Sequence, residues 1–526
     1  MKSLLISYKF IFIMRIGVDV GGTNTDAALM DGRTVVDAVK SVTTEDTGLG
    51  IIEAVSKILD KTKILPNQLE AIMIGTTQFT NAFVENKRLE KVAVVRLGHP
   101  ATISVPPCID FSINLRKILG ENFWILPGGY EFDGRNLGDW TEEKVKKVAH
   151  EIASKGIKYI AVSCVFSPIN EKQEIKTAKI IKKIIPEAII TMSHRIGRVG
   201  FIERENATIM NSSLGYLANK VVTSFNVALN KLKIKCPFYI SQNDGTLMAA
   251  NLVKNYPVLT FASGPTNSMR GAAFLSGYKN AIVVDIGGTT TDFGVIKEGF
   301  PRESSLPVDI GGVRTNFRMP DLVSIGLGGG SLIQSYNNNI TVGPESVGFK
   351  LTTESLIFGG KILTASDIAI SHGLANFGDR NKISHLDKNT VVKAIKLIKG
   401  MIEEGIDRVK LNKDPVPVIL VGGGNILVED NLEGAQEVIV PEYSDVANAI
   451  GASLAQAGGE IDKIYSYSDI GREKSIELAK TDAIQRARQA GAKEETISII
   501  ELEEIPLTYL PSGAVRLHVK AVGDLF

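Results

Sequence analysis

The chain has 526 residues and almost balanced charges, with 59 lysines and arginines against 58 aspartates and glutamates. A net charge of +1 gives no field for a polyanion, and 44% hydrophobic with 22% charged residues is typical of a soluble enzyme, so nucleic-acid binding, disorder and a membrane protein are not expected. The three cysteines and six histidines form no C-x-x-C or H-E-x-x-H motif, which argues against a disulfide framework and a preformed zinc site. The composition favours the cytoplasm, and the length predicts three or four domains.

Residues 1–13 read MKSLLISYKFIFI and combine basic residues with an apolar run, as a signal peptide does. Lys9 interrupts the run, however, and no small-residue cleavage site follows it. We interpret residues 1–13 as an extension that precedes a start at Met14.

The first motif, residues 16–26, reads IGVDVGGTNTD, and an apolar strand resumes at Ala27. A buried strand brings Asp19 to its end, and the glycines let backbone N–H groups approach an anion without interference from a Cβ atom. Because a second strand follows the turn, the motif predicts the tip of a β-hairpin and differs from a P-loop, which opens a helix. The expected phosphate-binding residues of this tip are Gly21, Gly22, Thr23, Asn24 and Thr25.

A strand at residues 34–39, a helix at 49–59 and a short strand at 71–74 follow the first motif. The short strand leads into Thr76, Thr77 and Asn81, just ahead of a predicted helix at 82–90. These residues could simply cap that helix, because Thr and Asn side chains accept hydrogen bonds from its first N–H groups. The functional alternative is a loop that presents their hydroxyl and amide groups to a substrate.

Apolar and amphipathic segments alternate from residue 92 to residue 274. We place a domain boundary near residue 190, and we expect the charged segment 195–205 to be either a solvated face or a loop that lines a cleft. The predicted strands are 92–96, 158–163, 238–241 and 258–261, and the predicted helices are 141–155, 171–185, 206–231 and 268–274.

Residues 282–292 read IVVDIGGTTTD and match the first motif, 266 positions upstream, at eight of eleven positions. Two ordinary hairpin turns would share glycines but would not require recurring aspartates and threonines. The repeat therefore predicts two similar domains with a nucleotide between their hairpin tips. This pattern resembles the actin-like ATPase superfamily, which includes sugar kinases, Hsp70 and actin. The second copy supplies Asp285 and Asp292, with Gly287, Gly288, Thr289, Thr290 and Thr291 as phosphate-binding residues.

A glycine-rich segment at residues 321–331 reads DLVSIGLGGGS. A flexible linker can have this composition, but the flanking residues are apolar, which favours a substrate or phosphate loop. The residues expected to face the substrate are Gly328, Gly329, Gly330 and Ser331, with Asp321 as a catalytic candidate.

A second glycine-rich segment follows an apolar strand predicted at residues 416–421. It resembles the superfamily's adenosine-contact turn, in which glycines let the backbone lie against the flat purine. A plain strand-to-helix turn is the alternative. The residues concerned are Gly422, Gly423, Gly424 and Asn425.

A long amphipathic helix is predicted at residues 389–409, and small residues at 447–452 are expected where two connecting helices cross. From residue 464 the composition changes to a charged helix at 473–490 and two strands at 496–502 and 514–522. We interpret residues 461–526 as a small C-terminal α+β module.

Four motifs in order resemble the hydantoinase A/5-oxoprolinase family, which also includes the acetone carboxylase β subunit. Beside the second hairpin motif, they are Gly75-Thr76-Thr77 with Thr80-Asn81-Ala82, then Ser263-Gly264-Pro265, then Gly328-Gly329-Gly330-Ser331. The resemblance covers residues 14–460. The chain departs from the family at Ile74 and Val323, where relatives carry histidines, and at residues 343–348, where relatives have a Gly-Pro-x-Cys-Tyr-Gly segment. These departures predict a less polar pocket without a transition metal, and a substrate different from the family's best-known ones.

The resemblance implies an α/β fold with two ribonuclease-H-like domains, residues 14–190 and 191–460, around a nucleotide cleft. It implies an ATP-dependent hydrolase that phosphorylates the carbonyl oxygen of a small cyclic amide, of the hydantoin or 5-oxoproline type, before the ring opens. A small-molecule kinase or a carboxylase subunit of the same superfamily is the alternative, and a non-enzymatic assembly factor regulated by ATP is a third hypothesis.

The expected cofactors are ATP and Mg²⁺. Mg²⁺ prefers oxygen ligands, and we expect Asp19 and Asp285 to hold it and to belong to the catalytic set. The base that activates water stays open among Asp26, Asp292 and Asp321. The expected partners are a small-molecule substrate, a second subunit of the hydantoinase B type and further copies of the chain.

Overall fold

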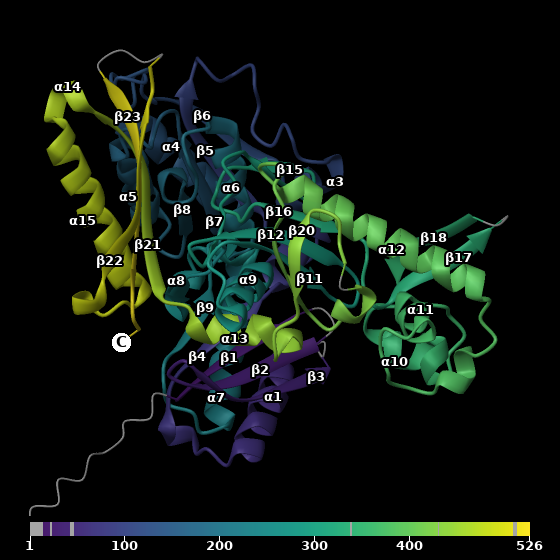
Figure 1. Ribbon diagram of the computed structural model, residues 1–526. Coiled ribbons are helices and arrows are strands. Elements are labelled where there is room, and N and C mark those ends of the chain that lie inside the picture. The colour runs from purple at the N-terminus through teal and green to yellow at the C-terminus, as the bar shows by residue number, and fades with distance from the viewer. Residues whose placement is uncertain are drawn as a thin grey trace, which may run out of the picture.

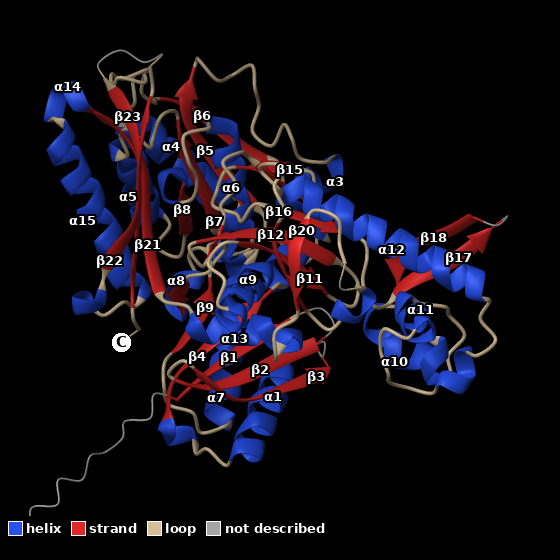
Figure 2. Cartoon of the chain, in the orientation of Figure 1, coloured by secondary structure: helices blue, strands red, loops and turns tan. Residues whose placement is uncertain are grey.

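The computed structural model describes residues 14–21, 24–42, 47–336, 339–429, 431–508 and 513–525, and it has an α/β fold with mixed sheets (Figures 1 and 2). The predicted extension at residues 1–13 and the phosphate-binding candidates Gly22 and Thr23 lie outside the described residues. Within the described ranges, no helix combines the length and apolar character needed to cross a membrane.

The largest sheet contains nine strands, which are, from one edge to the other, β22 (Ser498–Pro506), β23 (Ala514–Gly523), β21 (Ala457–Ser466), β10 (Leu247–Ala249), β9 (Phe238–Ser241), β4 (Leu69–Thr76), β1 (Met14–Val20), β2 (Asn24–Asp31) and β3 (Thr34–Val42). Strands β1 to β3 form an antiparallel meander, while β1, β4 and β9 run parallel. Helices α1 (Thr47–Thr62) and α7 (Gly215–Lys231) lie below these strands in Figure 1, and α13 (Ala447–Leu454) lies above them. Because both faces are covered, β1 is buried almost throughout, as its apolar sequence predicted.

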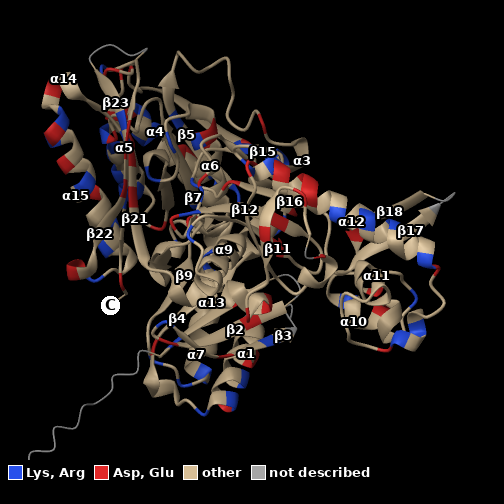
Figure 3. Cartoon of the chain, in the orientation of Figure 1, with Lys and Arg blue, Asp and Glu red and all other residues tan. Residues whose placement is uncertain are grey.

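The C-terminal strands belong to this nine-stranded sheet, whereas the sequence had suggested a small module of their own. Strand β21 joins the sheet through a parallel pairing of Ala457 with Leu247 of β10. Helix α15 (Arg472–Ala490) packs on β21 with alanines at every fourth position, including Ala479, Ala483 and Ala487, and Figure 3 shows charged residues along the same helix. The sequence did not reveal the connection because β21 begins before the change in composition at residue 464. The short helix α14 (Tyr467–Ile470) precedes α15.

A separate sheet of four parallel strands has the order β6-β5-β7-β8, with bounds β6 (Asn122–Pro127), β5 (Val92–His99), β7 (Tyr159–Cys164) and β8 (Ile189–Met192). Helices α4 (Glu142–Ser154) and α5 (Lys172–Ile184) contact each other, and α5 and α6 (Phe201–Ser213) both pack on β7. The short helix α3 (Ile113–Leu119) lies in the connection between β5 and β6. The first half of the chain is therefore divided between two sheets, which the local patterns did not predict.

The third sheet carries the second motif and has six strands, with β13 (Phe300–Pro301), β12 (Thr291–Lys297), β11 (Ala281–Ile286), β19 (Val416–Val421) and β20 (Ala435–Ile439) in order, and β16 (Leu322–Ile325) also paired with β12. Helices α9 (Ser263–Ser276) and α12 (Lys388–Val409) pack on this sheet. The projection at the right of Figure 1 contains β17 (Ser331–Tyr336), β18 (Asn339–Ser346), α10 (Leu351–Glu354) and α11 (Ala365–His372). A small hairpin elsewhere pairs β14 (Val308–Ile310) with β15 (Val313–Thr315).

Helices α9 and α13 cross in close contact between the nine-stranded and six-stranded sheets. A Cβ atom on Gly271 of α9 would lie 1.9 Å from the carbonyl oxygen of Ala447, and one on Gly451 of α13 would lie 1.9 Å from that of Asn267. Only glycine fits at these two positions. The crossing predicted from the small residues at 447–452 is therefore confirmed.

Three predicted elements differ from the structure. Residues 258–261 were predicted as a strand, but Pro257–Thr260 forms a 3₁₀ helix, and Pro257 has no N–H to donate to a strand ladder. The single helix predicted at 206–231 is two helices, α6 and α7, which meet at Leu214. The helix predicted at 82–90 is α2 (Gln78–Val84), and it stops ahead of Asn86, which has a positive φ of 55°. The four-residue helix α8 (Ala250–Val253) was not predicted.

Candidate functional site

The two copies of the repeated motif fold as the same backbone device. At the first tip the N–H of Gly21 donates to the carbonyl oxygen of Asn24 at 3.0 Å, and at the second tip Gly287 donates to Thr290 at 2.9 Å. Both motifs connect antiparallel strands. The prediction of two hairpin tips, as opposed to strand-to-helix loops, is therefore confirmed.

Each hairpin places two aspartates opposite each other across its strands. Asp19 of β1 pairs in register with Asp26 of β2, and Asp285 of β11 pairs with Asp292 of β12. Burial and the negative charges of Asp26 and Asp285 together raise the pKa of Asp19 to about 7. The effect of Asp285 indicates that carboxylates of the two hairpins lie within electrostatic reach of each other.

The two crossing helices hold the Asp19 carboxylate in place. Asn267 of α9 donates to Asp19 Oδ1 at 3.3 Å, and Asn448 of α13 donates to Asp19 Oδ2 at 3.1 Å. Asn448 also donates to Asp26 Oδ2 at 3.0 Å. The sequence did not reveal a role for either amide, although Asn267 closely follows Ser263-Gly264-Pro265 and Asn448 lies in the small-residue segment.

The second hairpin has different side-chain surroundings. Burial raises the pKa of Asp292 to about 6, while a hydrogen bond from the Ser324 hydroxyl of β16 opposes that shift. Burial likewise raises the pKa of Asp285, which a hydrogen bond from Ser268 opposes. Among the described residues, neither carboxylate has an ion-pair partner within 4.0 Å, whereas Asp26 lies 3.5 Å from Lys40 Nζ.

These four aspartates form a donor set that suits Mg²⁺. All four offer carboxylate oxygens, with no sulfur or imidazole ligand among them, and the amides of Asn267 and Asn448 bind Asp19 and Asp26. A hard cation that prefers oxygen ligands and keeps several waters fits such a set. The raised pKa values have the same physical origin, because buried carboxylates without enough positive charge around them favour protonation or a bound cation.

The hairpin tips leave room for a ligand. A Cβ atom on Gly21 would meet only the Asn24 carbonyl oxygen, at 3.1 Å, and one on Gly287 only that of Thr290, at 3.3 Å. Thr289 and Thr290 are exposed. Asn24 is partly buried, and Thr25 and Thr291 are fully buried, with the Thr291 hydroxyl donating to the Leu327 carbonyl oxygen at 2.7 Å. The last two side chains thus face the interior, away from the open tips.

The segment Gly422 to Asn425 lies directly against the second hairpin. Gly424 N–H donates to the Ile286 carbonyl oxygen at 2.7 Å, and a Cβ atom on Gly422 would lie 2.4 Å from Asp285 Oδ1. Gly422 also has a φ of 83°, which glycine adopts without strain. Gly423 has no atom within 4 Å of an added Cβ, so this turn has free space on its outer side.

The loop at residues 326–331 also packs on the second hairpin. Gly329 N–H donates to the Gly287 carbonyl oxygen at 3.0 Å, and Gly330 N–H donates to that of Gly288 at 2.8 Å. Gly328 N–H is taken by the Ser331 hydroxyl at 2.8 Å. Because these N–H groups already have acceptors, the loop's evident contribution is to hold the hairpin tip in position.

The Gly75-Thr76-Thr77 segment lies beside the first hairpin. Gly75 pairs in register with Asp19, and a Cβ atom on Gly75 would lie 2.2 Å from Asp19 Oδ1. Ser263 at the start of α9 bonds to both backbone groups of Thr76, at 3.2 and 3.1 Å. Thr77 is partly exposed and Asn81 is exposed.

Asp321 is the predicted site residue that lies apart from the others. Arg302 binds one of its carboxylate oxygens through two nitrogens, at 3.0 and 2.6 Å, and also donates to the Val409 carbonyl oxygen at 3.1 Å. None of these contacts involves a hairpin tip. The geometry therefore gives Asp321 the role of anchoring Arg302 near the end of α12.

Comparisons with known proteins identify two family regions in the chain. The hydantoinase/oxoprolinase N-terminal region matches residues 15–185, and the hydantoinase/oxoprolinase domain matches residues 204–410. The chain is 25% identical to the acetophenone carboxylase gamma subunit of Aromatoleum aromaticum over 399 residues, covering 69% of this chain and 54% of that subunit. It is 24% identical to caprolactamase subunit alpha of Pseudomonas jessenii over 542 residues, covering 91% of this chain and 75% of that one.

A solved structure shares the fold. The ATP-dependent caprolactamase from Pseudomonas jessenii superposes with a TM-score of 0.78 at 19% identity, over 97% of this chain and 88% of that one. The chain thus spans about half of the acetophenone carboxylase subunit and most of the caprolactamase chain.

Proposed function

We propose a function from the premise that this chain belongs to the hydantoinase/oxoprolinase family. In our proposal it uses ATP to phosphorylate the carbonyl oxygen of a small cyclic amide, and the activated ring carbon is then attacked by water. Phosphorylation makes the ring carbon a better electrophile. After water adds to that carbon, the ring C–N bond breaks with the protonated amine as leaving group, and hydrolysis of the resulting acyl phosphate releases phosphate and the open-chain carboxylate. The names of the two relatives described above, a caprolactamase and a carboxylase subunit, indicate that those proteins act on carbonyl compounds.

The observation that carries the proposal is the pair of matched hairpins. Two matching backbone tips each carry an aspartate at the end of a buried strand, and α9 bonds to both, through Asn267 to Asp19 and through Ser268 to Asp285. Phosphoryl transfer is catalysed mainly by positioning and by neutralising charge, so two opposed sets of amides and carboxylates suit it well.

Asp19 and Asp285 would hold Mg²⁺, which supplies positive charge to the phosphates when it is bound. Asn267 and Asn448 fix the orientation of the Asp19 carboxylate through its two oxygens. Free backbone N–H groups and exposed hydroxyls at the tips, such as those of Thr289 and Thr290, would hold the phosphate oxygens. We assign the adenosine to the outer side of the turn at Gly423.

We assign the amide substrate to the side of Thr77 and Asn81, which present a hydroxyl and an amide beside the first hairpin. Of the three candidate bases, Asp292 is the one that we propose. Lys40 and Asn448 engage Asp26, and Arg302 engages Asp321, whereas Asp292 has one hydrogen bond, from Ser324, among the described residues. A base needs an oxygen that is free to accept a proton.

A carboxylase subunit is the second candidate function, favoured by the similarity to the acetophenone carboxylase gamma subunit. The same site would then phosphorylate a carbonyl substrate that later reacts with a carbon dioxide equivalent. Both relatives are named as subunits, so we propose that this chain also works with a partner subunit, of the hydantoinase B type.

The test is to measure ADP release with Mg²⁺-ATP and a panel of caprolactam, hydantoin, 5-oxoproline, acetone and acetophenone, with and without bicarbonate and a candidate partner. We expect ADP release to depend on a cyclic amide and to be independent of bicarbonate. Dependence on a ketone with bicarbonate would establish the carboxylase function instead. A stable phosphorylated product would indicate a kinase, and the absence of any Mg²⁺-dependent nucleotide binding would exclude all three.

A further inference from the structure

A cavity of about 470 Å³ lies away from the hairpin tips, between three parts of the chain. Its walls come from the 3₁₀ helix Ser193–Arg195 and the residues that follow it, the loop after β9, and β21 with α15. This volume is in the range of pockets that hold small molecules. The proposed function assigns nothing to it.

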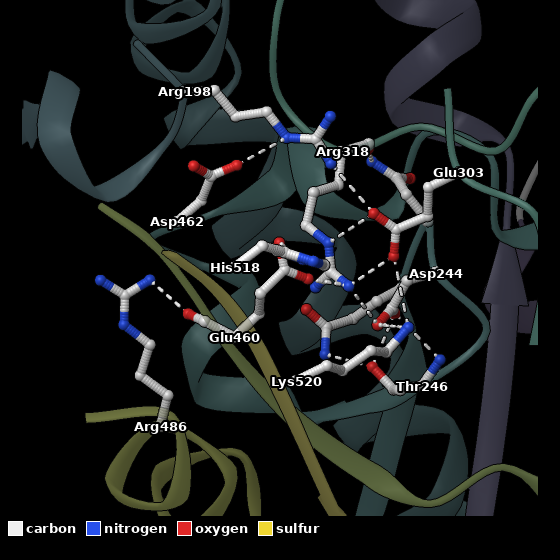
Figure 4. Close-up of polar contacts among 12 residues, drawn as sticks. Arg198, Asp244, Thr246, Glu303, Arg318, Glu460, Asp462, Arg486, His518 and Lys520 are labelled. Carbon is white, nitrogen blue, oxygen red and sulfur yellow. Dashed lines mark hydrogen bonds and ion pairs between the residues drawn. The ribbon is translucent and has the colours of Figure 1, made fainter. Parts of the chain in front are cut away.

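One wall of the cavity is a buried network of ion pairs, which Figure 4 shows. Lys520 of β23 lies 2.9 Å from Asp244 and 3.3 Å from Glu303, while Arg318 lies 3.1 Å from Asp244 and 2.6 Å from Glu303. Each carboxylate that lines the cavity has a Lys or Arg partner within 4.0 Å. The lining carboxylates are Glu171, Asp244, Glu460, Asp462 and Asp482.

Two cationic side chains that line the same cavity have no such partner. Arg486 of α15 donates to the backbone carbonyl oxygen of Glu460 at 2.9 Å, and Arg195 donates to the Tyr256 hydroxyl at 3.4 Å. Among the described residues, neither guanidinium group has a carboxylate within 4.0 Å. The lining holds five carboxylates and five Lys or Arg side chains, and Arg318 and Lys463 each pair with two of the carboxylates. Arg195 and Arg486 are therefore the two lining cations that form no ion pair with a described residue.

The two guanidinium groups are also close enough to affect each other. Burial lowers the pKa of Arg486, and the charge of Arg195 adds to that shift, against the opposing effects of Tyr256, Asp482 and Glu171. Like charges at the edge of a cavity are unfavourable unless a counter-charge is present. A planar guanidinium binds a carboxylate through two parallel N–H···O bonds, so a pair of them suits this anion.

We propose that this cavity binds a small organic carboxylate, with its anionic group between Arg195 and Arg486. The rest of the lining explains why the ligand is organic: the side chains of Leu252, Leu259 and Met248 provide an apolar surface, and Gln242 provides a hydrogen-bonding amide. The ligand therefore carries one anionic end and a mainly apolar body.

This site is a neighbour of the nucleotide site, but it is distinct from it. Asp19, Gly75 and Ser241 lie at the ends of the neighbouring parallel strands β1, β4 and β9, so the loop after β9 is two strands, or about 10 Å, from Asp19. Thr266 of α9 connects the two regions by donating to the Gln242 carbonyl oxygen at 3.2 Å. The inference goes beyond the proposed function, because the cavity needs no nucleotide to bind its ligand.

Isothermal titration calorimetry of the nucleotide-free chain provides the test. The probes are the carboxylates phenylacetate, glutarate and 5-oxoproline, the neutral analogue phenylacetamide, and inorganic sulfate. We expect at least one carboxylate to bind, with affinity at least 10-fold above that of phenylacetamide and of sulfate. Arg486→Gln and Arg195→Gln should each weaken this binding at least 10-fold.

The matched control is Arg488→Gln on the same helix. Arg488 is exposed, pairs with Glu494 at 2.8 Å and lies two positions, about 200°, around the helix from Arg486. Its substitution should change affinity less than twofold.

Since Arg195 is exposed, its variant is expected to fold even if Arg486→Gln does not. The proposal is overturned if no carboxylate binds at millimolar concentration, if sulfate binds as well as the best carboxylate, or if Arg195→Gln leaves the affinity unchanged. Mg²⁺-ATP affinity, measured in the same variants, should not change.

Discussion

The two hairpins share one backbone and differ in what surrounds their aspartates. At the first tip, Asp26 is held by Lys40 and Asn448, and the sheet behind it continues into the C-terminal strands. At the second tip, Asp292 has no cationic partner among the described residues. In our proposal, the repeat supplies two equivalent positions for a metal and phosphates. The side chains around the first tip hold Asp26 in place, and those around the second tip leave Asp292 free to take part in proton transfer.

The largest expected effect comes from removing one of the two equivalent carboxylates. Asp285→Asn keeps the shape of the side chain and removes its charge, so Mg²⁺-ATP turnover should fall by about 10²–10⁴-fold. The melting temperature of the nucleotide-free variant should not fall, because the substitution removes a negative charge that lies unfavourably near the Asp19 carboxylate.

The matched control for this change is Asp309→Asn. Asp309 begins an Asp-Ile-Gly-Gly sequence in the β14–β15 hairpin, where its carboxylate accepts from Gly312 N–H at 2.8 Å at an exposed turn. Turnover should stay within twofold of wild type. Equal losses of turnover in the two variants would contradict a specific role for Asp285 at the second hairpin.

Asp26 and Asp292 occupy equivalent positions in the two hairpins, so a comparison of their variants distinguishes a catalytic base from a structural residue. Asp292→Asn should lower kcat by roughly 10²–10³-fold with little change in the affinity for Mg²⁺-ADP, since a base acts on the water and not on the nucleotide. Asp26→Asn should leave kcat within about 10-fold. Stopped-flow or steady-state kinetics with ADP titration measures both, and the reverse order of the two losses would assign the base to the first hairpin.

The ion-pair network of Asp244, Glu303, Arg318 and Lys520 should contribute much of the stability of the nine-stranded sheet. Lys520→Met leaves Asp244 and Glu303 with less positive charge in a buried place, so the free energy of unfolding should fall by about 3–5 kcal/mol. Hydrogen exchange should show the loss in β9, β21 and β23 before β11 and β12. A uniform loss across both sheets would show that the two halves unfold as one unit.

The same network predicts a pH dependence. Burial would raise the pKa of Glu303, but Arg318 and Lys520 outweigh it and hold the pKa at about 2 against an ordinary 4.5. Because the folded pKa is depressed, the stabilisation is complete above about pH 4.5 and is lost as the pH falls toward 2. Denaturant unfolding between pH 7 and 3 should show this decline, and Glu303→Gln should flatten it.

The smallest expected effect concerns Lys40, which is one-third exposed and pairs with Asp26 at 3.5 Å. Lys40→Met should reduce stability by about 1 kcal/mol, because exposed partners contribute little. Chemical denaturation at pH 7 would detect a change of that size. A loss of several kcal/mol would make the first hairpin far more dependent on this pair than its exposure indicates.

The hairpins could be predicted from sequence because their determinants are local. A buried strand, two glycines and a second strand lie within eleven residues, so both tips and the closeness of Asp19 and Asp285 followed from the repeat. Asn267 and Asn448 could not be predicted in the same way. They reach Asp19 across 248 and 429 positions, and no local pattern marks an asparagine that will meet a distant carboxylate.

The errors in the fold have similar causes. The C-terminal strands join the large sheet through the single register pair Leu247 and Ala457, which leaves no trace in composition. The short apolar segment at residues 258–261 fits a strand or a helical turn equally well, and Pro257 decides for the turn. The role of the loop at 326–331 in substrate binding stays a prediction, and what the sequence did not reveal is that Gly329 and Gly330 bond to the backbone of the second hairpin.

The most direct test of the central claim is a double-mutant cycle on Mg²⁺-ADP affinity with Asp19→Asn, Asp285→Asn and the double variant, measured by calorimetry with and without Mg²⁺. If both carboxylates hold one cation, each single variant should lose most of the Mg²⁺-dependent affinity, and the double variant should lose little more, with a coupling energy above about 1 kcal/mol. Losses that add within about 0.5 kcal/mol, or a Mg²⁺ dependence that survives in the double variant, would contradict the claim that the two hairpins form one site.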